Sequence, residues 1–195
     1  MAGFSRAELE SYRGATVPDL VGPGVRLLFV GINPGLWTAA VQTHFAHPAN
    51  RFYPALLRAG IITRRIDPSA GMTDTDREHL LGRGVGVTNL VPRATARASE
   101  VSAAELRAGV ERLERLVKAC TPRVVAVAGI SAYRLAYGRR TAMVGRQPEA
   151  INGVPLWVVP NPSGLNAHET IVSLADAYAE VASAAGISLV LPTET

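Results

Sequence analysis

Short, nearly continuous apolar runs alternate with helical patterns along the chain. Four runs predict strands, at Val25–Val30, Val85–Val91, Arg123–Ala128 and Pro155–Val159. Because these runs have no polar face, they are typical of strands that are covered on both sides in a parallel sheet.

Apolar residues spaced three or four apart predict helices between and after these strands. The clearest helix begins at Ser102, which forms a capping-box pattern with Glu105, and it ends before Pro122. A second helix begins near Asn50, and a third follows Asn166. The alternating order predicts an α/β fold, a three-layer αβα arrangement with a central, mainly parallel sheet.

The chain of 195 residues shows no internal repeat and no composition shift that would mark a linker. We expect a single domain over residues 1–195, with an N-terminal helical extension over about residues 1–22 and a frayed tail over residues 192–195. The polar segment from Arg64 to Thr75 predicts a surface excursion.

Composition narrows the classes of function. No apolar stretch is long enough to span a bilayer, and charges near the amino terminus leave no apolar signal core, so we expect a cytoplasmic protein with no membrane partner. A single cysteine, Cys120, excludes an intrachain disulfide and a cysteine-based zinc site. The excess of 20 Lys and Arg over 16 Asp and Glu suits a polyanionic partner without proving one.

Ligands of parallel sheets bind beyond the carboxyl ends of the strands, so the segments there carry the most information. The first strand is followed by Gly31-Ile32-Asn33-Pro34-Gly35 and then by Phe45-Ala46-His47-Pro48-Ala49-Asn50-Arg51-Phe52, and the fourth by Asn161-Pro162-Ser163-Gly164-Leu165-Asn166. In this order, the segments resemble the mismatch-specific uracil-DNA glycosylases, whose broader family includes thymine-DNA glycosylase. The resemblance runs from about Val25 to about Tyr178.

The resemblance implies a uracil-DNA glycosylase fold and a hydrolase that cleaves the bond between a flipped base and its deoxyribose, which starts base excision repair. It implies no metal and no cofactor. The expected partner is double-stranded DNA that contains a G·U mismatch, bound by a monomer. Lyase activity usually needs a pocket lysine, and the one lysine, Lys118, lies far from either motif, so we expect a monofunctional enzyme.

Asn33 matches the family position that holds the attacking water. An amide is no general base near neutral pH, so it can only orient the water through its carbonyl oxygen. Without the resemblance, Asn33 would be interpreted as a turn residue ahead of Pro34.

Gly35 matches a position where relatives that are strict for uracil carry a bulky aromatic side chain. The resemblance therefore implies room for larger bases, such as ethenocytosine and, weakly, thymine. The alternative is that Gly35 supplies a positive φ after Pro34.

Phe45 matches the aromatic residue that stacks on the extruded base. Candidate hydrogen-bonding groups for the base lie at Ile32, Thr38 and Asn89, and Asn161 matches a residue near the base or the adjacent phosphate.

His44 and His47 have a spacing that would suit a metal site. No acidic or thiol ligand accompanies them, so we expect a structural hydrogen bond from His47 instead.

Leu165 resembles an apolar wedge that fills the gap left by a flipped nucleotide. The alternative is a hydrophobic staple before a helix capped by Asn166. The residues expected to contact DNA are Arg51, Arg93, Ser163, Gly164, Leu165, Asn166 and His168.

Two positions depart from the family's pattern. Pro92 stands where an acidic residue commonly precedes the arginine, here Arg93. The Asn166-Ala167 pair lacks an arginine that some members carry nearby, and His168 would replace part of that contact. Both departures leave the lesion preference open.

Three alternatives to a G·U-specific glycosylase follow from the same residues. The first is a broader uracil-DNA glycosylase that acts on other deaminated bases or on single strands. The second is a catalytically weak binder of damaged DNA, and the third is a nucleotide-binding α/β protein. The third is disfavoured because Gly31 to Gly35 has neither a dinucleotide fingerprint nor a phosphate-loop lysine.

Overall fold

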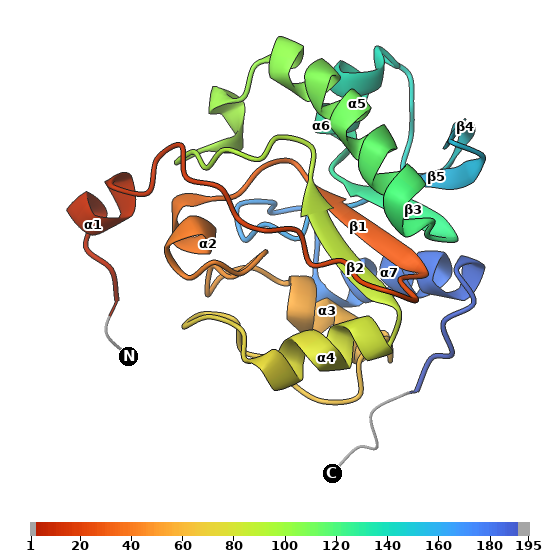
Figure 1. The fold of residues 1–195 in the computed structure, drawn as a ribbon, viewed down its shortest axis with the longest axis horizontal. Coiled ribbons are helices and arrows are strands. Elements are labelled where there is room, and N and C mark those ends of the chain that lie inside the picture. Colours follow the sequence, from red (N-terminus) through yellow and green to blue (C-terminus); the bar gives the residue numbers. More distant parts are fainter. Residues whose placement is uncertain (1–2, 191–195) are drawn as a thin grey trace.

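The computed structural model describes residues 3–190, and its centre is a five-stranded sheet between two layers of helices (Figure 1). The strands are β1 (Leu27–Gly31), β2 (Val85–Asn89), β3 (Val124–Ala128), β4 (Gly145–Ile151) and β5 (Val154–Val159). Their order across the sheet is β2-β1-β3-β5-β4, with β4 antiparallel to β5 and the other neighbouring pairs parallel. The predicted αβα arrangement with a mainly parallel sheet is confirmed.

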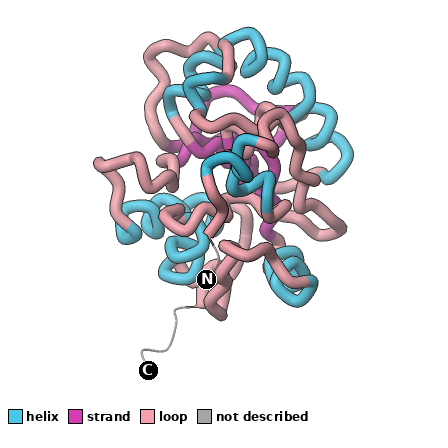
Figure 2. The backbone as a smooth tube through the Cα atoms, turned by 90° about the vertical axis from the view of Figure 1, so that its left-hand side faces the viewer, coloured by secondary structure: helices cyan, strands magenta, loops and turns pink. Residues whose placement is uncertain are grey.

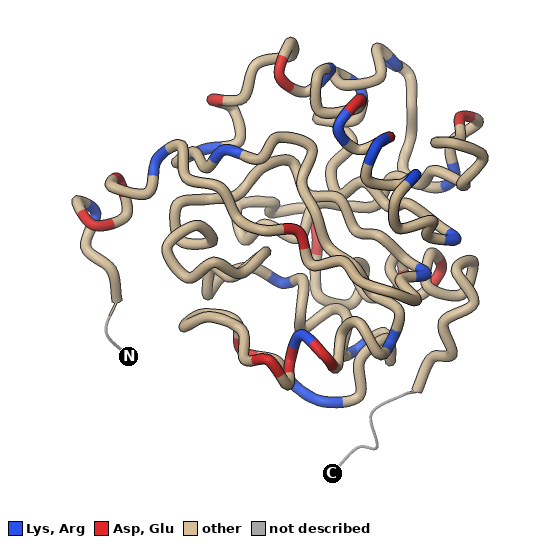
Figure 3. The backbone as a smooth tube through the Cα atoms, viewed as in Figure 1, with Lys and Arg blue, Asp and Glu red and all other residues tan. Residues whose placement is uncertain are grey.

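Helices cover both faces of this sheet (Figures 1 and 2). The helices are α1 (Arg6–Glu10), α2 (Leu36–Ala40), α3 (Phe52–Arg58), α4 (Asp74–Gly82), α5 (Ala103–Cys120), α6 (Ile130–Tyr137) and α7 (Ile171–Ala184), with a short 3₁₀ turn at Ala98–Glu100. Helices α5 and α6 pack on one face, and α3, α4 and α7 pack on the other. Figure 3 shows the charged residues mainly on helices and loops around the sheet.

The strands are apolar along their length because both of their faces are buried. In β1, Leu27 and Phe29 belong to the core beneath α3 and α7, whereas Leu28 and Val30 belong to the core beneath α5 and α6. This alternation follows from the two-residue period of a strand. It explains why the four apolar runs were recognisable in the sequence.

Several elements differ from the prediction. Strand β4 was missed because only alternate residues are buried in it, which is typical of an edge strand, and because it contains Pro148. Helix α4 was also missed, and its start at Asp74 overlaps the end of the predicted surface excursion. The predicted frayed tail over residues 192–195 lies outside the described residues.

The segment before β1 packs along β2, the strand at one edge of the sheet. Helix occupies only Arg6–Glu10 of the predicted helical extension, and the later part of this segment forms bridges from Thr16 to Arg93 and from Leu20 to Val87. These bridges place Pro18 and its neighbours beside the carboxyl end of β2. Within residues 3–190, no helix has both the length and the apolar character needed to cross a membrane.

Candidate active site

The carboxyl ends of β1 and β2 meet the loop at Phe45. Gly31 is the last residue of β1 and is paired in register with Asn89, the last residue of β2. A Cβ atom at Gly31 would lie 2.3 Å from Asn89 Oδ1 and 3.3 Å from Phe45 Cζ. Only glycine therefore fits at Gly31, and three predicted site segments lie in direct contact.

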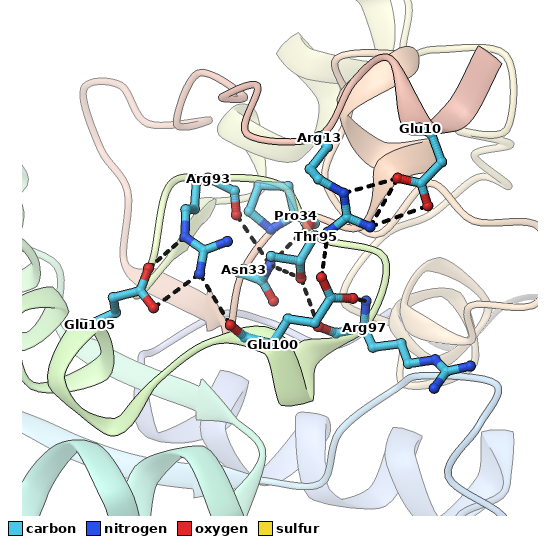
Figure 4. Close-up of polar contacts among 9 residues, drawn as sticks. All are labelled: Glu10, Arg13, Asn33, Pro34, Arg93, Thr95, Arg97, Glu100 and Glu105. Carbon is cyan, nitrogen blue, oxygen red and sulfur yellow. Dashed lines mark hydrogen bonds and ion pairs between the residues drawn. The ribbon is translucent and has the colours of Figure 1, made fainter. Parts of the chain in front are cut away.

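Asn33 follows this junction, and its amide is held in one orientation (Figure 4). Its Nδ2 donates to the carbonyl oxygens of Pro34 and Arg93, both at 3.1 Å, and to the Thr95 hydroxyl at 2.8 Å. The Thr95 hydroxyl donates in turn to the Arg97 carbonyl at 2.8 Å. Because carbonyl oxygens only accept, the NH₂ group must face the loop, and Asn33 Oδ1 faces away from it.

Asn33 Oδ1 makes no hydrogen bond within residues 3–190, and the residue is only half-buried. The interpretation of Asn33 as a turn residue needs Oδ1 to accept a nearby backbone N–H group, and the structure shows no such bond. The oxygen is therefore free to accept a hydrogen bond from a water molecule.

Gly35 directly precedes α2, as its N-cap, and has an ordinary extended backbone, with φ −75° and ψ 165°. The alternative explanation that Gly35 provides a positive φ is therefore wrong. A Cβ atom at Gly35 would have no heavy atom within 4 Å, and the residue is exposed. The position thus has room for a side chain.

Phe45 is held in the left-handed region, with φ 55°. For a residue with a side chain this conformation costs about 1–2 kcal/mol, and such residues concentrate at functional sites. Its ring stacks on Phe52, with centroids 4.2 Å apart and an interplanar angle of 28°. One face of the Phe45 ring is therefore covered by Phe52, and the residue is only partly buried.

His44 fixes the side-chain amide of Asn89. His44 Nε2 lies 2.9 Å from the Pro18 carbonyl and must donate to it, so in the neutral ring Nδ1 is the acceptor. Asn89 Nδ2 donates to this Nδ1 at 3.0 Å. Asn89 Oδ1 is consequently turned toward Gly31, where it presents a hydrogen-bond acceptor.

Burial lowers the pKa of His44, so this histidine stays neutral in the folded protein. The unfolded chain protonates the same side chain near pH 6.5, so it binds more protons than the folded chain below that pH. We expect the free energy of unfolding to fall as the pH drops below about 6.5, and part of this fall to disappear in His44→Gln.

Denaturant unfolding of the wild type and the variant between pH 5 and 8 measures this difference. His168→Gln is the matched control, because His168 is exposed on a loop. Identical pH dependences for wild type and His44→Gln would contradict the buried neutral state.

The other predicted pocket residues lie near the same strand ends. The Ile32 carbonyl already accepts from the backbone N–H of Val91 at 2.9 Å, which leaves that carbonyl engaged. Thr38 is buried in α2, and its hydroxyl makes no hydrogen bond within residues 3–190. Asn161 Oδ1 accepts from the Ser163 N–H at 2.9 Å, so its NH₂ group faces the opposite way, on the side of Gly129.

The loop between β5 and α7, residues 160–170, exposes its central leucine. Leu165 is 93% exposed, so the hydrophobic-staple alternative is wrong. Asn166 does not cap α7, because the cap is Thr170, whose hydroxyl accepts from the Ser173 N–H at 3.1 Å. Asn166 Nδ2 instead donates to the Asn161 carbonyl at 3.1 Å, which closes the loop on itself.

The two arginines expected to contact phosphate are both engaged by protein groups. Arg93 forms an ion pair with Glu105 on α5 and donates to the Glu100 carbonyl (Figure 4). The Arg93 guanidinium lowers the pKa of Glu105 to about 2. The guanidinium of Arg51 donates to three backbone carbonyls of the β5–α7 loop. These contacts argue against phosphate binding by either side chain.

Arg97, which the sequence analysis did not single out, lies two residues after Thr95, whose hydroxyl holds the Asn33 amide. Arg97 is exposed, and its guanidinium makes no hydrogen bond or ion pair within residues 3–190. It points away from the polar cluster in Figure 4. Nothing in the sequence distinguishes Arg97 from the other arginines. Whether its guanidinium has a partner depends on which carboxylates form ion pairs with neighbouring arginines in the folded protein.

His47 has the structural hydrogen bond that was expected, since its Nδ1 accepts from the Ala49 N–H at 3.1 Å. His44 is occupied by Pro18 and Asn89, as described above. Across residues 3–190, no three His, Cys, Asp or Glu side chains are grouped in a way that could hold a metal ion.

Comparison with known proteins places this arrangement in a family. The sequence model of the Uracil DNA glycosylase superfamily matches residues 18–182, which include the five strands and both loops described above. The chain therefore belongs to the uracil DNA glycosylase superfamily. Membership implies a hydrolase that acts as a DNA N-glycosylase.

A solved structure shares the fold. It is the NMR solution structure of a candidate uracil DNA glycosylase from Methanosarcina acetivorans. The TM-score is 0.62 at 15% sequence identity, and the match covers 88% of this chain and 98% of that chain. At this level of identity the likeness extends to the fold alone.

Proposed function

We propose that the protein is a monofunctional DNA glycosylase that hydrolyses the N-glycosidic bond of uracil opposite guanine, and so starts base excision repair. It acts as a monomer on double-stranded DNA, without a metal or a cofactor. The observation that carries this proposal is the orientation of the Asn33 amide. Three acceptors hold its NH₂ group, and its carbonyl oxygen is left open at a strand end of the superfamily fold.

Asn33 orients the attacking water in this mechanism and does not deprotonate it, because an amide has no basic lone pair near neutral pH. Positioning alone contributes several kcal/mol when the water is held in a near-attack geometry. The loop that carries Asn33 is anchored to Thr95 and Arg93, which keeps the amide rigid. The reaction therefore depends on the flipped base bringing its sugar to this water.

The base pocket favours uracil over cytosine through Asn89. The N3 atom of uracil carries a hydrogen and donates, whereas N3 of cytosine only accepts. Asn89 Oδ1, fixed by His44, is an acceptor and so matches uracil. Phe45 supplies a stacking surface worth about 1–3 kcal/mol, which does not identify the base by itself.

Preference for the mismatch comes from the cost of base flipping and from Leu165. A G·U pair is easier to open than a matched A·U pair, which lowers the flipping cost of a few kcal/mol. The exposed leucine fills the gap that the flipped base leaves, as apolar wedges do in other DNA-binding proteins.

Single-turnover uracil release tests the proposal with four substrates, which carry G·U, A·U, G·T and single-stranded uracil. We expect the fastest release from G·U and slower release from A·U. Equal rates on G·U and A·U would favour a broader uracil-DNA glycosylase. Binding without any release would favour a catalytically weak binder of damaged DNA.

Gly35 determines how large a base the pocket accepts. Because its backbone is ordinary and its Cβ position is open, Gly35→Phe should fold normally. We expect this variant to release ethenocytosine more slowly by roughly tenfold or more, while uracil release changes less. The reason is that one group more or less in a shaped pocket changes transition-state binding by about 1–3 kcal/mol. Gly82→Phe, at the end of α4, is the matched control, because Gly82 is exposed, has no positive φ and has no heavy atom within 4 Å of its Cβ position. Equal losses on both bases would show that Gly35 does not face the base.

A further inference from the structure

Arg51 holds the β5–α7 loop at four places along its length. Its Nη2 donates to the carbonyls of Ser163 at 2.5 Å and Asn166 at 2.8 Å, and its Nη1 donates to the carbonyl of Glu169. Its backbone N–H donates to the Pro162 carbonyl at 3.0 Å. One residue of the segment before α3 thus binds the whole loop that carries Leu165.

The Arg51 guanidinium has only backbone partners. It forms no ion pair within residues 3–190, and its Nε is buried without a hydrogen-bond partner. The positive charge is compensated by carbonyl dipoles of the loop. A planar guanidinium can reach several carbonyls from fixed directions, which the single ammonium group of a lysine cannot reproduce.

The loop also packs closely against the backbone of the residues that precede Arg51. A Cβ atom at Gly164 would lie 2.6 Å from the Ala49 carbonyl oxygen, so only a glycine permits this contact. Leu165 lies between two carbonyls that Arg51 holds, and its own side chain is 93% exposed. The position of Leu165 is therefore set by its backbone.

We propose that Arg51 is a positioning residue that preorganises Leu165 for insertion into DNA, and that it does not bind phosphate. This inference rests on the proposed function, because it assigns Leu165 as the wedge. It also couples two parts of the site, since Phe45 stacks on Phe52, the residue next to Arg51. The base pocket and the wedge are thus built on one rigid segment.

A double-mutant cycle tests this proposal by single-turnover uracil release from G·U duplex and from single-stranded DNA. The proteins are wild type, Arg51→Lys, Leu165→Ala and the double variant. We expect Arg51→Lys to slow release from duplex by roughly tenfold or more, because hydrogen bonds of a charged group are lost. The effect should be much smaller on single strands, and it should vanish in the Leu165→Ala background.

Arg58→Lys is the matched control, because Arg58 is an exposed arginine at the end of α3, the helix that follows Arg51, without a hydrogen bond or ion pair in the described part of the chain. Gly164→Ala disturbs the loop from its other side and should reproduce the duplex-selective loss, even if Arg51→Lys does not fold. A duplex effect of Arg51→Lys that persists in the Leu165→Ala background would overturn the proposal. So would a decrease of about one in the salt slope of duplex binding in Arg51→Gln, which removes the charge, because that decrease is the signature of a phosphate contact.

Failure of the proposed function can be distinguished from failure of this inference. Absence of uracil release by the wild type would contradict the function. Amide hydrogen exchange in free wild type and Arg51→Lys reports the order of the loop without any substrate. We expect faster exchange of the Asn166 amide in Arg51→Lys, because that N–H donates to the Ser163 carbonyl held by Arg51. Unchanged exchange would overturn the positioning role.

Discussion

Asn33→Ala is expected to lower uracil release by roughly a hundredfold or more, with duplex affinity close to that of the wild type. The reason is geometric, because the amide oxygen orients the water but makes no contact that binds the DNA strand. Removing the side chain also leaves the Thr95 hydroxyl and the Arg93 carbonyl without this donor, whereas the Pro34 carbonyl still accepts from the Thr95 N–H at 3.1 Å, so the loop loosens but the sheet does not. Single-turnover release and binding of uracil-containing duplex measure the two quantities separately.

Asn33→Asp sharpens this test. One carboxylate oxygen would replace Nδ2 and face the carbonyl oxygens of Pro34 and Arg93, so a stronger base would be gained at the cost of repulsion. We expect this variant to be less active than the wild type. Asn152→Ala is the matched control, since Asn152 lies in the turn between β4 and β5, far from the site along β5, and its Nδ2 also donates to a backbone carbonyl, that of Glu114. Equal losses of affinity and rate in Asn33→Ala would mean that Asn33 mainly shapes the loop.

Leu165→Ala is expected to slow uracil release from G·U and A·U duplexes by roughly tenfold or more, because a wedge offsets a few kcal/mol of unstacking. On single-stranded uracil the effect should nearly disappear, since no base stack has to be held open. Thermal stability should change little, because the side chain is 93% exposed.

The matched control for this prediction is Leu135→Ala, which removes another exposed leucine, on α6. Rates on duplex and single strands provide the comparison. Loss of activity by the same factor on both substrates would contradict the role of Leu165 as a wedge.

The sequence predicted those strands whose burial on both faces produces an uninterrupted run of apolar residues. Strands β1, β2, β3 and β5 are covered on both faces, so their apolar runs mark them. Strand β4 lies at the edge with one buried face and carries polar residues, so its pattern resembles a loop. The start of α7 was misplaced because Asn166 has a side chain that suits a cap but bonds to Asn161 instead.

The sequence predicted those features of the candidate site that lie within one short segment of the chain. It did not predict contacts between residues that are far apart in the sequence. Gly31, Phe45 and Asn89 were expected at strand ends, and the structure brings them into contact. The pairing of His44 with Asn89 joins residues 45 positions apart, and no local pattern indicates it. The carbonyls that accept from Arg51 lie more than 100 positions away, so no local pattern indicates these hydrogen bonds.

We propose that this member of the superfamily hydrolyses the glycosidic bond of uracil in a G·U mismatch. Mass spectrometry of a G·U duplex after incubation with the protein tests it most directly. We expect free uracil and an intact abasic strand in equal amounts from the wild type, and much slower formation of both by Asn33→Ala. A duplex that is bound and recovered unchanged would contradict glycosylase activity, and a strand cut at the abasic position without added base would contradict a monofunctional enzyme.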